Sequence, residues 1–120
     1  IGIYADNGNN YPGALVVEAT SITQINTGST GVKTATGGLP VTLDTGLYWL
    51  VSVSNAAATF RGIGATSLTP ALGYSSTLGT AASIGWSVAY TYAALPATFT
   101  AGGALITAAY SPAVFVRTSQ

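Results

Sequence analysis

The chain has 120 residues and only six charged side chains, three acidic and three basic, so its formal net charge is zero. It contains no His and no Cys, which excludes disulfides, thiolate or imidazole metal sites and a Ser-His-Asp triad. Zero net charge also provides no electrostatic surface for nucleic acid or for an anionic membrane. Soluble domains usually carry about 25% charged residues, against 5% here. We therefore expect sister chains to cover much of the surface in a homo-oligomer.

Short apolar runs between Gly, Pro and Asn turn signals follow one another along the chain, a pattern typical of antiparallel strands. The first two runs, residues 1–5 and 14–19, flank the turn-forming cluster Asp6-Asn7-Gly8-Asn9-Asn10. Further short strands are expected at residues 20–25, 32–36, 41–43, 47–54, 58–61, 84–92, 98–100, 105–108 and 113–117.

Two of these strands show a clear alternation with period two. Residues 47–54 place Trp49 on a wholly apolar face, and residues 84–92 place Trp86 and Tyr90 opposite a face of small residues. Residues 62–80 are rich in Gly, Ser and Thr and predict a long loop. Helix signals are nearly absent. About nine to ten short strands predict an all-β fold, a jelly-roll-like antiparallel β-sandwich, formed by residues 1–120 as a single domain.

Candidate catalytic and metal-binding groups are few. A glycosidase needs two carboxylates separated by roughly 5–10 Å, and the chain offers only Asp6, Glu18 and Asp44. Asp6 and Asp44 lie in turn-like contexts, where Asp commonly binds its own backbone. The Asp6 cluster has one carboxylate, fewer than a calcium site usually has, so we expect an Asx turn there. We predict neither enzymatic activity nor a cofactor.

The aromatic residues are the best candidates for binding. Trp49, Trp86 and Tyr90 are predicted to lie in the core or at a subunit interface. Tyr11 and Tyr74 lie in loop-like segments and are the candidate surface or glycan contacts, with internal packing as the alternative role. Mean hydropathy is positive at +0.48, but no 18-residue run is free of Gly, Pro or Thr, so we expect no membrane span.

Several segments resemble a β-sandwich module found in tail, fibre and other virion structural proteins of tailed bacteriophages. The resemblance lies in residues 1–8 and 11–16, in residues 41–51 with their Tyr48-Trp49-Leu50 strand, and in residues 111–117. It implies a display domain at the C-terminal end of a longer phage protein. That domain would be located on the extracellular virion surface and would often be trimeric. The implied partners are other virion proteins and a host-surface glycan. A basic residue usually precedes the first Ile of that module and is missing here. The resemblance transfers no catalytic residue.

Two other functions are compatible with the same pattern. A carbohydrate-binding module of a secreted bacterial protein would be a monomer with a row of exposed aromatic residues. A bacterial surface or filament subunit would form open-ended contacts between copies.

Overall fold

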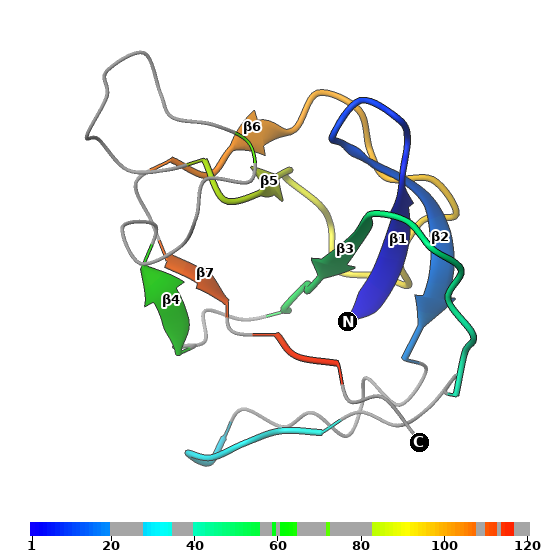
Figure 1. Ribbon diagram of the computed structural model, residues 1–120. Helices are drawn as coiled ribbons and strands as arrows, with labels where there is room; N and C mark the ends of the chain where they lie inside the picture. Colours follow the sequence, from blue (N-terminus) through cyan, green and yellow to red (C-terminus); the bar gives the residue numbers. More distant parts are fainter. Residues whose placement is uncertain are drawn as a thin grey trace. The chain divides into compact units, whose positions relative to one another are not determined.

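The computed structural model describes residues 1–19, 28–34, 40–55, 59, 61–64, 72, 83–107, 110–112 and 114–116. Within these residues it contains seven β-strands and no helix, and every strand pair is antiparallel (Figure 1). The chain is therefore mostly β. The strand predicted at residues 20–25 lies outside the described residues, as does Tyr74.

The chain divides into two compact units by its internal contacts. The first consists of Ile1–Ala58, Tyr92–Phe99 and Val114–Gln120, and the second of Thr59–Thr91 and Thr100–Ala113.

The first unit contains a three-stranded sheet with the strand order β2-β1-β3. Its strands are β1 (Gly2–Asp6), β2 (Pro12–Glu18) and β3 (Tyr48–Val51). The register between β1 and β2 shifts twice, between Ile3 and Tyr4 and between Tyr4 and Asp6. These irregularities bend the hairpin and increase its twist. The predicted strands at residues 1–5, 14–19 and 47–54 are thus confirmed, although β3 is shorter than its apolar pattern.

A distant segment covers the outer edge of β2. Ala14 forms a bridge with Thr98, the Leu15 N–H donates to the Ala97 carbonyl at 2.9 Å, and the Phe99 N–H donates to the Gly13 carbonyl at 2.9 Å. This segment satisfies β2 backbone groups that would otherwise face water as an open sheet edge. At the opposite side of the sheet, β3 is the edge strand among those that the structure describes.

Tyr4 is the centre of the described core in this unit. Its side chain is fully buried, its hydroxyl donates to the Pro96 carbonyl at 2.7 Å, and its ring meets Phe99 edge to face at 5.5 Å. Leu95 packs over Gly2, where an added Cβ would lie only 2.5 Å from Leu95 Cδ1. Residues 92–99 therefore close one face of the sheet through one aromatic cluster, one hydrogen bond and one close backbone approach.

The second unit contains two short antiparallel strand pairs. Strand β4 (Gly62–Gly64) pairs with β7 (Tyr110–Pro112), and β5 (Trp86–Ser87) pairs with β6 (Ala104–Leu105). The β4 strand lies at the start of residues 62–80, which the sequence predicts as loop.

The β5 strand is much shorter than the alternation over residues 84–92 predicts. Trp86 pairs with Leu105 and Ser87 with Ala104, and the next partners along the chain are Gly103 and Gly102. Gly102 has a φ of +78°, which turns the backbone away from a strand conformation. The length of the partner, rather than the apolar pattern of residues 84–92, therefore limits this strand.

The long-range hydrogen bond of Tyr4 provides a test of this core. Tyr4→Phe should lower the free energy of unfolding by about 1 kcal/mol, because it leaves the Pro96 carbonyl without its partner. Tyr48→Phe is the matched control, since the Tyr48 hydroxyl makes an exposed, local bond to the Asp44 carbonyl at 2.9 Å. Its effect should stay within about 0.5 kcal/mol. Urea unfolding measures both values, and equal losses in the two variants would contradict this assignment of the core.

Candidate functional site

The Asp6 carboxylate organises the loop that joins β1 to β2. Its Oδ2 accepts the Gly8 N–H at 2.7 Å, and it also accepts backbone hydrogen bonds from Asn10 and Tyr11. Asn7 repeats the pattern, because its Oδ1 accepts the Asn9 N–H at 2.9 Å. These bonds confirm the predicted Asx turn. Gly8 and Asn10 supply the positive φ values that the tight loop requires.

The same carboxylate also binds the neighbouring strand. The Trp49 indole Nε1–H donates to Asp6 Oδ1 at 2.8 Å, and the Asp6 backbone N–H donates to the Leu47 carbonyl at 3.0 Å. Trp49 pairs with Tyr4 across the sheet, so its indole reaches diagonally to Asp6, two residues further along β1. A single carboxylate thus joins the β1–β2 loop to β3.

These hydrogen bonds stabilise the ionised form of Asp6. They hold its pKa below the ordinary value of 3.8, with the Trp49 indole as the largest cause and the backbone amides of the loop as smaller ones, against partial desolvation. A carboxylate with a lowered pKa is poorly suited to act as a general acid near neutral pH. Its bonding indicates a structural role.

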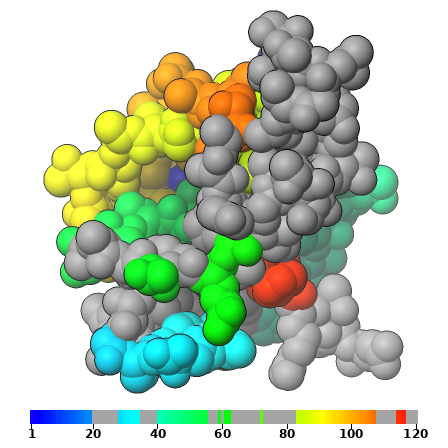
Figure 2. Space-filling model, turned by 90° about the vertical axis from the view of Figure 1, so that its left-hand side faces the viewer, coloured from blue at the N-terminus to red at the C-terminus, as the bar shows by residue number. Residues whose placement is uncertain are grey.

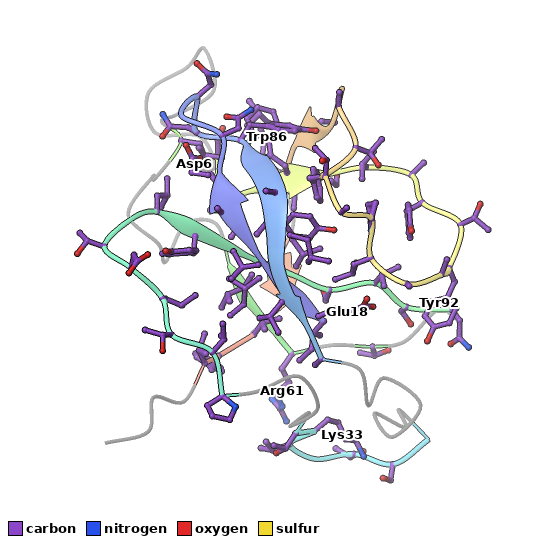
Figure 3. All side chains as sticks on the ribbon, turned by 90° about the vertical axis from the view of Figure 1, so that its right-hand side faces the viewer. Asp6, Glu18, Lys33, Arg61, Trp86 and Tyr92 are labelled. Atoms are coloured by element: carbon purple, nitrogen blue, oxygen red, sulfur yellow. The ribbon has the colours of Figure 1, made fainter. Side chains whose placement is uncertain are left out.

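The Glu18 carboxylate lies apart from Asp6. Glu18 pairs with Gly2, at the far end of the hairpin from the Asp6–Pro12 pair, as Figure 3 shows. At about 3.3 Å per residue, the four-residue step from Gly2 to Asp6 along β1 separates the two pairs by roughly 13 Å. That exceeds the carboxylate separation of a glycosidase, which is below about 10 Å.

Glu18 has a structural partner of its own. Its Oε1 accepts the Leu95 N–H at 3.1 Å and so helps to hold residues 92–99 on the sheet. Among the described residues, no group of three His, Cys, Asp or Glu side chains could hold a metal ion. The described part of the chain also contains no helix of the length and hydropathy needed to cross a bilayer.

The predicted aromatic contacts have different environments. Tyr11 is half-buried, and its ring packs edge to face on Phe99 at 5.6 Å, which corresponds to the packing alternative for this residue. Trp49 and Trp86 are half-buried in β3 and β5. Tyr90 is 37% exposed. Tyr11 and Trp49 belong to the first unit, and Trp86 and Tyr90 belong to the second.

Sequence reasoning missed both Tyr4 and the bond between Asp6 and Trp49. An indole N–H can only donate and usually finds an acceptor when its ring is buried. The chain has only three carboxylates that could accept this N–H. The need of the Trp49 indole for an acceptor was therefore the one sequence signal for its bond to Asp6.

Large apolar side chains are exposed on several described segments. In the first unit, Leu47 directly before β3 and Leu50 within it are 51% and 40% exposed, and Phe115 and Val116 are 79% and 49% exposed. Val32 is 96% exposed within residues 28–34, which Figure 2 shows in cyan at the surface. Lys33 lies in the same segment, where its Nζ donates to Ser29 Oγ at 2.8 Å (Figure 3). These side chains are the strongest surface feature of the described residues.

No protein-family model, no curated protein and no solved structure matches this chain.

The lowered pKa of Asp6 predicts a pH dependence of stability. Because the folded pKa lies below 3.8, the contribution of Asp6 is complete above the unfolded-state pKa. It is lost as the pH falls through the folded pKa. Asp6→Asn should therefore lower the free energy of unfolding at pH 7 and flatten its decline below about pH 4. Unfolding in urea between pH 2 and pH 7 measures both effects.

Two further variants act as controls for this prediction. Trp49→Phe keeps the carboxylate but removes the largest cause of the shift, so it should reduce the acid-dependent decline only in part. Asp44→Asn removes a carboxylate that makes no bond to Asp6. Asp6→Asn should therefore change the stability by the same amount in the wild-type chain and in the Asp44→Asn variant. If the free energy of unfolding of Asp6→Asn declined below about pH 4 as steeply as that of the wild type, the structural role given to the Asp6 carboxylate would be contradicted.

Proposed function

We propose that the chain is a non-enzymatic structural module of a phage virion, in a fibre, tail or head-decoration element. It acts there as a homo-oligomer, for which a trimer is favoured, and displays its surface toward the host. The virion assignment rests on the resemblance of residues 1–16, 41–51 and 111–117 to such modules. The assembly assignment rests on the surface of the described residues.

The observation that carries the proposal is the exposure of large apolar side chains on a chain with six charges. Apolar side chains that are exposed singly are ordinary on a monomer. Here, however, Leu50 in β3 and Leu47 directly before it are both exposed, on opposite faces of the strand, and exposed Phe115 is followed directly by exposed Val116. Charge repulsion between copies is weak because the net charge is zero. Burial of these side chains against another copy would be favourable at about 25 cal/mol per Å² of apolar surface.

We also propose that the complete domain is a jelly-roll-like sandwich of about nine to ten strands. Seven strands are described, and the strand predicted at residues 20–25 would be an eighth. The antiparallel pairing of all described strands is compatible with either a sandwich or a barrel.

A glycan-binding monomer is the competing function. Tyr92, in the segment that covers the sheet of the first unit, is 43% exposed and offers an aromatic ring for sugar stacking. The other candidate in that unit, Tyr11, has its ring engaged by Phe99. The exposed aromatic residues among the described part of this unit are Tyr92 and Phe115, which lie in separate segments of the chain.

The mass of the protein in solution tests the proposal. We expect sedimentation equilibrium at micromolar concentration to give a multiple of the 12.0 kDa chain mass, with three copies favoured. Antibody labelling in electron micrographs of the native phage particle should then place the chain on the virion. A stable monomer that binds polysaccharide would overturn the proposal in favour of the glycan-binding module.

A further inference from the structure

Among the described residues, β3 forms the uncovered edge of the first unit's sheet. The Asp6 N–H donates to the Leu47 carbonyl, so Asp6 and Leu47 form a hydrogen-bonded pair. In an antiparallel ladder such pairs alternate, which makes Tyr4–Trp49 and Gly2–Val51 the next two. The backbone N–H and C=O groups of Tyr48 and Leu50 therefore point away from β1. Among the described residues no strand pairs with this side of β3.

In the part of the chain that the structure describes, this edge shows none of the features that normally prevent a sheet from growing. Natural edge strands are protected by Lys, Pro, bulges or a covering segment. Residues Tyr48–Val51 are Tyr, Trp, Leu and Val, and they pair with β1 in a regular register without a bulge. Leu50, whose backbone groups point outward, also has a 40% exposed side chain.

A strand-forming segment of the same unit has no place in any strand. Residues 114–116 are Val, Phe and Val, which favour β structure. They nevertheless lie outside every described strand, although the sequence predicts a strand at residues 113–117. Phe115 is 79% exposed and Val116 49% exposed. Figure 2 shows this segment, in red, at the surface.

We propose that residues 114–116 of one copy add as a further antiparallel strand to the β3 edge of a second copy. This inference rests on the proposed function, because it names the surface through which the chain assembles. The two surfaces are complementary. One supplies outward backbone groups and an exposed Leu50, and the other supplies an apolar, strand-forming segment that the chain does not pair with its own β3.

The register follows from the backbone and from side-chain exposure together. With Phe115 opposite Leu50, the new strand exchanges both hydrogen bonds with the outward groups of Leu50. The exposed side chains of Leu50 and Phe115 then lie next to each other on one face. Val114 and Val116 lie beside Val51 and Trp49 on the other face, which Tyr4 shares.

The contact joins two different surfaces, so it is heterologous. Such a contact produces a closed ring when the rotation between copies closes, and an open filament when it does not. A trimeric ring fits this rule, whereas a symmetric dimer formed through β3 against β3 does not.

Introduced cysteines test the contact on the full chain, which has none of its own. A hydrogen-bonded antiparallel pair has a Cα separation of about 5.5 Å, within the range that a disulfide spans. Under mild oxidation, the double variant Leu50→Cys/Phe115→Cys should form covalent oligomers larger than a dimer. A mixture of the two single variants should form the disulfide between positions 50 and 115, identified by peptide mass, while each single variant alone should not dimerise.

Other cross-linking patterns would overturn the inference. A disulfide within one chain would show pairing in the same copy, and dimers of Leu50→Cys alone would show symmetric β3 pairing. If the protein is oligomeric but positions 50 and 115 do not link, this contact is wrong while the proposed assembly stands. If the protein stays a monomer at every concentration, both fail.

Substitutions at the two surfaces provide a second readout without cysteine. Leu50→Lys places a charge on the edge, and Phe115→Ser removes the largest side chain of the added strand. Each should raise the concentration for half-assembly by on the order of tenfold, the equivalent of one to two lost hydrogen bonds. Leu43→Lys is the control, because Leu43 is 38% exposed but lies outside both surfaces. An equal effect of the control would contradict the assignment.

Discussion

The hydrogen bonds to the Asp6 carboxylate are the constraint on which the described sheet depends. The carboxylate accepts N–H groups from its own loop and from the indole of Trp49, so it connects the β1–β2 hairpin to a strand more than forty residues away. An ionised carboxylate can accept about four hydrogen bonds and has no donor to leave unsatisfied. An amide in its place would direct two N–H groups toward other donors. One of the chain's three acidic side chains therefore stabilises a turn and the attachment of a strand.

Strand positions near the start of the chain could be predicted because local signals determine them. The Asx turn at Asp6 and the apolar runs on either side required only neighbouring residues, and both are present. The role of Tyr4 could not be predicted in this way. The alternation over residues 1–5 places Tyr4 on the same side as Gly2, and only residues 92–99, far along the chain, make that side a core. The sequence left surface contact and internal packing open for Tyr11 for the same reason, since the residue that packs on it, Phe99, lies far along the chain.

Strand lengths were predicted poorly because a strand is defined by its partner. Residues 84–92 alternate well, but β5 has two residues because the glycines before β6 end the pairing. Residues 113–117 have strong strand propensity, yet no described strand includes 114–116. Propensity describes how well a side chain fits a pleated surface, and it does not supply the neighbouring backbone.

The two edges of the sheet in the first unit illustrate how a chain with little charge can satisfy exposed backbone groups. At β2, the chain's own residues 97–99 provide a partner, and Glu18 and Leu95 help to hold that segment in position. At β3, the described residues provide no such cover, and the sequence there contains no charge to discourage pairing. A strand from another copy would complete this edge by the same chemistry that covers the first. With only a few residues in each added strand, a single contact would be weak. Closure of a ring makes each copy bind two neighbours at once, which raises the stability of the assembly above that of one contact.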